Sequence, residues 1–208
     1  MNKVYQQTIS SSISFEGVGL HSGKISKVRL VPNTEGQGII FKRIDLSEEN
    51  IIQANYINVS AAKLCTTLKN PSGVRISTVE HLLAAFYIMG IDNVIVEVNN
   101  EEIPIMDGSS KDFIEILKNV GIKKQKIKRK YLKILNKLEF EDNGRTISIE
   151  PNNQNFEVEF KLNYLNNIIG KQKNCVNFSD SDLKDVYSSR TFCLFEDIEK
   201  IRKSGLAK

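Results

Sequence analysis

Histidine is scarce in this sequence, which has only two among its 208 residues, at positions 21 and 81. Imidazole is the commonest protein ligand of catalytic metals, and a catalytic zinc takes three protein ligands and an open position. Few places other than these two residues could therefore begin a metal site.

Cysteine is also rare, and Cys65, Cys175 and Cys193 form no CxxC pair. An odd number without paired spacing argues against a disulfide framework and a structural zinc ribbon, and it favours a reducing compartment. The longest apolar run, residues 82–89, is too short to span a bilayer, and residues 1–15 lack the apolar core of a signal peptide. The sequence predicts a soluble, cytoplasmic protein.

Positive charge is concentrated in one place. The composition is that of an ordinary globular protein, with 40% hydrophobic and 26% charged residues and a net charge of +4. Residues 123–130 hold six basic and no acidic residues, so removing these six charges from +4 leaves −2 for the remainder. We interpret the run as a solvated linker, because clustered like charges repel and resist burial. Contact with nucleic acid or with anionic membrane lipid would fit the same residues, although no interleaved aromatic residues or recognition motif accompany them.

A similar order of elements stands on both sides of this run. Strand patterns come first and helical patterns follow, which predicts an α+β fold with a first domain over 1–122, a basic linker over 123–130 and a second domain over 131–208. The predicted strands are 8–15, 25–31, 38–41, 93–98, 133–140, 146–151 and 156–164, and the predicted helices are 78–89, 111–120, 177–186 and 196–204.

A carboxylate and an imidazole stand side by side at the start of the first predicted helix. Ser77 or Thr78 is a suitable N-cap, and Glu80 follows Ser77 at the spacing of a capping box. Neighbouring helical side chains point about 100° apart, so His81 could hold a metal while Glu80 reaches a water bound to it. The alternative is that Glu80 only closes the capping box and that His81 is an ordinary, partly exposed histidine.

Four motifs together resemble one known family. They are GVGLHSG at 17–23, RISTVEHLLAA at 75–85, EIPIMDGSS at 102–110 and SSRTFCLFEDIE at 188–199, and they follow the family's order. This pattern is similar to that of the UDP-3-O-acyl-N-acetylglucosamine deacetylases, zinc-dependent enzymes of lipid A biosynthesis. The resemblance implies two domains alike in fold, each a mainly antiparallel sheet layered with helices, with the active site between them. It also implies a monomer that acts on a UDP-linked acylated glucosamine and binds no nucleic acid.

The resemblance assigns roles to individual residues. Glu80 would be the catalytic base, Thr191 the oxyanion-stabilising hydroxyl and His81 a zinc ligand. His21, Leu64, Cys65, Phe192 and Asp197 would line the substrate. For most of them an ordinary structural role remains the alternative. The hydroxyl of Thr191 could be satisfied locally at a turn, and His21 could be a turn histidine without a ligand. Cys65 could be a small buried hydrophobic residue, Phe192 could pack in the core and Asp197 could be a charge on a helix surface.

The sequence departs from the family in one respect. The family completes its zinc site with a histidine and an aspartate in a His-Lys-x-x-x-Asp motif, and a further histidine acts as general acid. No histidine follows His81 in this chain. We therefore expect a piece of a longer enzyme, with an incomplete second domain and the remaining zinc ligands beyond Lys208. A non-catalytic remnant that keeps affinity for a nucleotide sugar or an acyl chain is the alternative.

Overall fold

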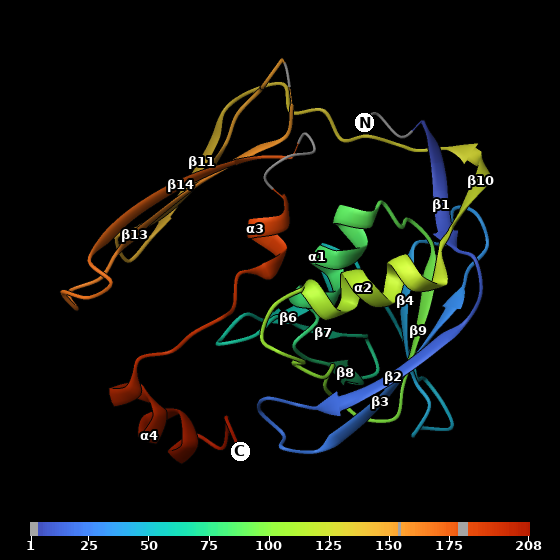
Figure 1. Cartoon of the computed structure of the whole chain (residues 1–208), viewed down its shortest axis with the longest axis horizontal. Helices are drawn as coiled ribbons and strands as arrows, with labels where there is room; N and C mark the ends of the chain where they lie inside the picture. Colours follow the sequence, from blue (N-terminus) through green and yellow to red (C-terminus); the bar gives the residue numbers. More distant parts are fainter. Residues whose placement is uncertain (1–3, 154, 179–182) are drawn as a thin grey trace. The chain divides into compact units, whose positions relative to one another are not determined.

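The computed structural model describes residues 4–153, 155–178 and 183–208 (Figure 1). Contacts divide these residues into two compact units, one of residues up to 128 together with 187–208, and one of residues 129–186. The sequence pattern assigns 187–208 to the second domain, whereas the contacts join them to the first unit. The prediction of an α+β fold is confirmed.

The first unit is built around a mixed sheet of five strands in the order β2-β3-β9-β4-β5. All neighbours are antiparallel except β4 and β9, which run parallel. Burial alternates along β3, as expected for a strand with one face on the core. The strands are β2 (Ile13–Val18), β3 (Ile25–Pro32), β4 (Ile39–Arg43), β5 (Ile51–Gln53) and β9 (Val94–Val98).

Two helices, α1 (Glu80–Met89) and α2 (Lys111–Val120), pack with this sheet around one apolar core (Figure 1). Phe41, Phe86 and Phe113 are its largest fully buried side chains, and the ring of Phe113 meets that of Phe15 edge-on at 5.6 Å. The core holds the start of α1 in a fixed place.

Smaller elements complete this unit. A three-stranded sheet of β6 (Val59–Ala61), β7 (Thr67–Lys69) and β8 (Arg75–Ile76) leads into α1, after the 3-10 helix η1 (Tyr56–Asn58). The helix α4 (Phe195–Lys203) lies within one residue of its predicted bounds. No helix among the described residues is long and apolar enough to cross a membrane.

The basic run is a strand for most of its length and not a linker. Residues Ile122–Lys128 form β10, which pairs antiparallel with β1 (Tyr5–Ile9). Gln125 ties the strand to the body of the unit, since its Nε2 donates to the carbonyl of Asn33 at 2.9 Å and its Oε1 accepts from Asn93 Nδ2 at 2.7 Å. The lysines stay exposed, so β10 forms without burying their charge.

The second unit consists of two hairpins and a short helix. The first hairpin turns at Asn143 and Gly144, where both residues have positive φ (49° and 73°), as a two-residue hairpin turn requires. The predicted strand 133–140 begins only at Leu138, and the predicted helix 177–186 falls partly on 179–182, outside the described residues. The elements are β11 (Leu138–Asp142), β12 (Arg145–Ile149), β13 (Glu157–Asn163), β14 (Lys171–Asn177) and α3 (Leu183–Ser188), the last of which runs into the first unit.

Limited proteolysis is expected to cut this second unit first. None of its described residues is fully buried, and Phe140, Ile147 and Phe160 are each more than half exposed. A segment without a buried core opens at little free-energy cost. Brief digestion followed by mass spectrometry is expected to find early cuts within 129–186 and an intact segment 4–128. Early cuts within α1 or β9 would contradict this account.

Candidate active site

Helix α1 sets the place of Glu80 and His81. It begins at Glu80 after the N-cap residue Val79 and ends at Gly90, which adopts a left-handed φ of 72°. The predicted end of this helix at residue 89 is confirmed, and Gly90 takes the left-handed conformation of the C-cap without steric cost. Glu80 and His81 thus both lie in the first turn, where the helix dipole favours an ionised carboxylate.

The predicted capping box is wrong. The start of α1 has no side-chain cap, because the two hydroxyls that precede it bind elsewhere. Ser77 Oγ donates to the carbonyl oxygen of Glu101 at 3.0 Å, and Thr78 Oγ1 donates to Glu102 Oε1 at 2.9 Å. The side chain of Glu80 is consequently not engaged as a cap.

Glu80 instead contacts the segment before β7. Its Oε2 accepts a hydrogen bond from the backbone N–H of Thr66 at 3.0 Å, and Oε1 accepts none from the described residues. The bond places the Leu64–Cys65 segment next to Glu80. Cys65 is half-buried, with its Sγ 3.7 Å from Thr67 Oγ1, and Leu64 is 53% exposed.

The loop before α2 joins His81 to a segment more than a hundred residues away. Ser110 Oγ donates to the backbone carbonyl of His81 at 2.9 Å, and the backbone N–H of Thr191 donates to the carbonyl of Gly108 at 2.9 Å. Thr191 is exposed, and its hydroxyl makes no hydrogen bond with the described residues. Residues 107–110 therefore hold the Glu80–His81 turn and Thr191 on the same part of the first unit.

Asp107 adds charge to this loop. Its carboxylate lies 3.5 Å from Arg190 Nε, and its Oδ1 accepts hydrogen bonds from the backbone N–H of Ser109 at 2.9 Å and from Ser109 Oγ at 2.6 Å. Asp107 does not cap α2, whose N-cap residue is Ser110. The bond from the Ser109 hydroxyl, more than the guanidinium of Arg190, lowers the pKa of Asp107.

The electrostatics around His81 favour the neutral ring. Burial lowers the pKa of His81, while the carboxylates of Glu80 and Asp107 oppose that shift. A neutral imidazole is the form that can donate a lone pair to a metal ion.

A buried carboxylate that sequence patterns do not reveal anchors the second histidine. Glu102 is 1% exposed, and it accepts hydrogen bonds from the backbone N–H groups of His21 (2.9 Å) and Ser22 (2.8 Å) in addition to the one from Thr78. Burial would raise the pKa of Glu102, but these hydrogen bonds outweigh it and lower the pKa overall. His21 is itself buried, and neither ring nitrogen has a hydrogen-bond partner among the described residues.

Three non-glycine residues near this site have positive φ. Leu64 (64°), Thr78 (57°) and Met106 (53°) each stand within two residues of Glu80, Thr66 or Asp107. Such conformations cost free energy for side chains with a Cβ, and they concentrate at functional sites where surrounding contacts enforce them. The strain therefore supports a functional role for this region.

Comparison with known proteins decides the family. Residues 6–208 match the family model described as UDP-3-O-acyl N-acetylglycosamine deacetylase. The chain belongs to this deacetylase family. It is 40% identical over 207 residues to the UDP-3-O-acyl-N-acetylglucosamine deacetylase of Shewanella frigidimarina, and 39% identical to those of Shewanella baltica and Shewanella oneidensis. In each case the match covers 98% of this chain and 67% of the relative.

The chain's described residues do not supply a complete metal site for a zinc-dependent deacetylase. No group of three or more His, Cys, Asp or Glu side chains among them is placed to hold a metal ion. A catalytic zinc requires three protein ligands. His81 is a candidate ligand, and the carboxylates of Glu80 and Asp107 lie near its ring.

Phe192 and Asp197, also expected to line the deacetylase substrate, lie in the C-terminal segment of the first unit. Phe192 follows Thr191 directly and is 56% exposed. Asp197 lies in α4, where its carboxylate is 3.5 Å from Lys200 Nζ, an ordinary helix-surface pair. The roles of Phe192 and Asp197 in a deacetylase stay predictions.

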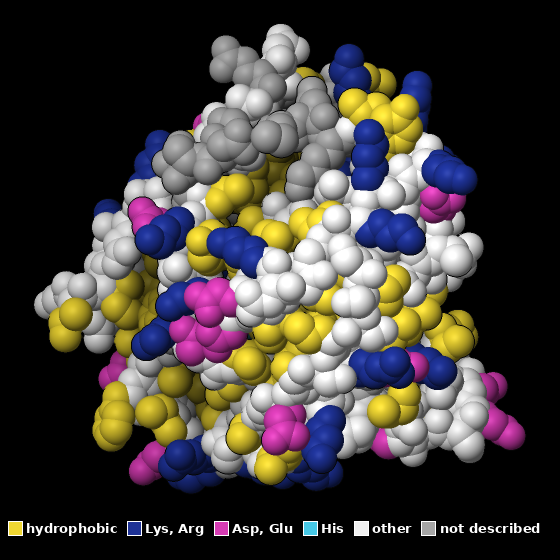
Figure 2. All heavy atoms as spheres, turned by 45° about the vertical axis from the view of Figure 1, so that its right-hand side comes forward, with side chains coloured by type: hydrophobic (Ala, Val, Ile, Leu, Met, Phe, Trp, Pro, Cys, Tyr) yellow, Lys and Arg dark blue, Asp and Glu magenta, His cyan; other side chains and the backbone are white. Residues whose placement is uncertain are grey.

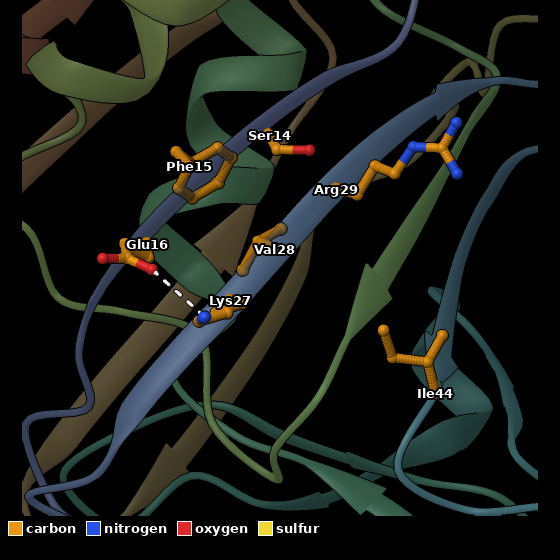
Figure 3. A pocket seen from close by; sticks show the side chains of 7 residues that line it. All are labelled: Ser14, Phe15, Glu16, Lys27, Val28, Arg29 and Ile44. Carbon is orange, nitrogen blue, oxygen red and sulfur yellow. Dashed lines mark ion pairs between the residues drawn. The ribbon is translucent and has the colours of Figure 1, made fainter.

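A surface hollow of about 340 Å³ lies apart from these residues. It opens over β2, β3 and the end of β4, and Figure 3 shows the side chains around it. Its lining includes none of the residues expected to serve the deacetylase reaction. The lining residues are Ser14, Phe15, Glu16, Lys27, Val28, Arg29 and Ile44.

Gly19→Ala is expected to destabilise the first unit by about 1–3 kcal/mol. A Cβ at Gly19 would collide with Glu102 Oε2 and Ser22 Oγ, and so disturb the hydrogen bonds around that carboxylate. Chemical denaturation measures the change in the free energy of unfolding. Ser11→Ala, at an exposed position, serves as the control and is expected to change stability by less than about 0.5 kcal/mol. Equal effects for the two variants would show that the close approach of Glu102 and Ser22 to Gly19 does not matter for stability.

Proposed function

We propose that this chain carries part of the active site of a deacetylase that hydrolyses the N-acetyl group of UDP-3-O-acyl-N-acetylglucosamine, a step of lipid A biosynthesis. The names of its relatives and the family match support the reaction class. The observation that carries the proposal is the loop 107–110, which bonds both the carbonyl of His81 and the amide of Thr191. This loop thereby holds His81 and Thr191, which are far apart in sequence and which the proposed reaction needs together.

Glu80 is the proposed general base. The hydrogen bond from Thr66 fixes one carboxylate oxygen, while Oε1 has no hydrogen bond from the described residues and is available to take a proton from water. Thr191 is the proposed oxyanion donor. Its backbone is fixed to Gly108 and its hydroxyl is not committed to another group, so it can donate to an oxyanion that forms on the amide carbon.

His81 is the proposed zinc ligand from this chain. When bound, zinc would polarise the amide carbonyl and lower the pKa of a coordinated water. Because the described residues supply only one ligand, the roles assigned to this chain are limited to metal binding by His81, proton transfer by Glu80 and hydrogen bonding by Thr191.

Substrate contacts are proposed on the two segments beside these residues. Leu64 and Cys65 adjoin Glu80 through the Thr66 bond, and exposed Phe192 adjoins Thr191, so both segments are placed to meet the sugar or its acyl chain. His21 and Asp197 are proposed contacts on the strength of the family pattern alone. We also propose a cytoplasmic monomer.

A non-catalytic binding module is the second candidate. The absence of a three-ligand group among the described residues favours it. Such a module would bind the nucleotide sugar or its acyl chain without releasing acetate.

A chimera tests the first proposal. The matched 207 residues of the Shewanella frigidimarina deacetylase would be replaced by those of this chain, so that the relative supplies the third of its length that lies outside the match. We expect the folded chimera to retain zinc and to release acetate from UDP-3-O-acyl-N-acetylglucosamine. A chimera with native-like circular dichroism that binds the substrate without releasing acetate would favour the binding module instead.

A further inference from the structure

Strand β10 concentrates exposed positive charge. Lys123, Lys124, Lys126 and Lys128 are all exposed, and in the described parts of the chain none of their ammonium groups forms an ion pair. The carboxylate of Glu35 meets this strand, but it binds the backbone N–H of Lys126 at 2.6 Å. Figure 2 brings this side of the molecule forward and shows Lys and Arg side chains gathered near its top.

Basic residues on the five-stranded sheet are arranged differently. Lys27 lies 3.9 Å from Glu16, and Arg29 and Lys42 lie 3.4 Å and 3.6 Å from the two carboxylate oxygens of Glu97. Lysine on an edge strand is a general protection against aggregation. The two lysines in strands of the five-stranded sheet, Lys27 and Lys42, each form an ion pair with an acid, and Lys69, which has no ion pair among the described residues, is the one lysine of β7. Strand β10 differs because it gathers four lysines without ion pairs in seven residues.

Apolar side chains are exposed among these lysines. Ile127 in β10 is 44% exposed, and Val4, directly before β1, is 54% exposed. The Lys124 ammonium lies 4.1 Å from the centroid of the Tyr5 ring. Lysines that extend past apolar and tyrosine side chains are typical of surfaces that meet the boundary between lipid headgroups and acyl chains.

We propose that the exposed lysines of β10 (Lys123, Lys124, Lys126 and Lys128), together with Ile127 and Val4, dock on an anionic lipid surface. Clusters of four or more lysines attract anionic headgroups, with about 1 kcal/mol for each residue near the surface, or about fivefold in affinity. Lipid fits better than nucleic acid because the Tyr5 ring is covered by Lys124 and no other aromatic side chain stands in β1 or β10 to stack on a base. The proposal goes beyond the deacetylase function and holds whether or not the chain is active.

Vesicle sedimentation of the 208-residue chain tests this proposal. Vesicles of phosphatidylcholine with phosphatidylglycerol are expected to bind the chain, with binding that weakens as salt rises. Vesicles of phosphatidylcholine alone are expected to bind it roughly 600-fold more weakly. Equal binding to both would place the contact on the apolar hairpins of residues 129–186 and overturn the proposal.

Two matched variants locate the contact. Replacing all four β10 lysines by glutamine is expected to lower affinity for anionic vesicles by roughly 600-fold, about fivefold for each lysine. The control carries glutamine at Lys27, Lys42, Lys69 and Lys111, which changes the net charge equally, and it is expected to keep most of the affinity. If the fourfold β10 variant does not fold, the Lys123→Gln/Lys126→Gln pair replaces it, with a loss of about twentyfold. Equal losses in variant and control, or tighter binding to duplex DNA or RNA than to vesicles at equal salt, would contradict the proposal.

Discussion

Glu102→Ala is expected to lower the free energy of unfolding of the first unit by about 3–5 kcal/mol. The change leaves three donors without an acceptor, the buried N–H of His21 and hydroxyl of Thr78 and the partly buried N–H of Ser22. It also removes the link between the turn that carries His21 and the start of α1. Urea denaturation followed by circular dichroism, which reports helix and strand content together, measures the loss.

The neighbouring carboxylate provides a matched control. Glu101 pairs with Arg75 at 3.3 Å on the surface, so Glu101→Ala is expected to cost less than about 1 kcal/mol. Glu102→Gln keeps one acceptor oxygen and is expected to fall between the two alanine variants. A cost for Glu102→Ala no larger than that for Glu101→Ala would refute the anchoring role of Glu102.

The contribution of Glu102 is also expected to depend on pH. Its pKa in the folded chain is lowered from the ordinary value of 4.5, so the folded state holds the carboxylate ionised more strongly than the unfolded state does. The resulting stabilisation is present above the unfolded pKa and disappears as the pH falls through the folded pKa. The stability difference between the parent chain and Glu102→Gln should therefore shrink on acidification below about pH 4.5. A difference that stays constant down to the acid transition would contradict this assignment.

Glu80→Gln in the chimera is expected to reduce kcat by about 10²–10⁴-fold while zinc content stays unchanged. Glutamine can still accept the Thr66 hydrogen bond, but its amide cannot take a proton from water. Acetate release gives the rate, and metal analysis gives the zinc content. Glu101→Gln is the control, since its side chain makes only a surface pair with Arg75. Activity of the Glu80→Gln chimera within tenfold of its parent would exclude Glu80 as the base.

Elements with strong local signals were predictable from the sequence. The predicted bounds of α2 are confirmed, because an amphipathic run ends at Gly121, and the helix carrying Glu80 and His81 ends at Gly90 as expected. The family prediction is also confirmed, since its motifs are short and keep their order along the chain. Each of these predictions depended on residues close together in sequence.

Features that depend on distant contacts were not predictable. Glu102 and His21 are 81 positions apart, and the apolar segment around Glu102 gives no sign that its carboxylate is buried. The β10 strand has a charge pattern typical of a linker, and only its pairing with β1 and the bonds of Gln125 make it a strand. The positive φ of Leu64 and Thr78 opposes their intrinsic preferences, so tertiary contacts must enforce it.

His81→Ala in the chimera is the measurement that bears most directly on the proposed site. If the imidazole at the start of α1 anchors the catalytic ion beside Glu80, the variant will lose both tightly bound zinc and acetate release, while its unfolding transition stays near that of the parent chimera. Undiminished zinc content and acetate release in the folded variant would show that this turn is not the catalytic centre.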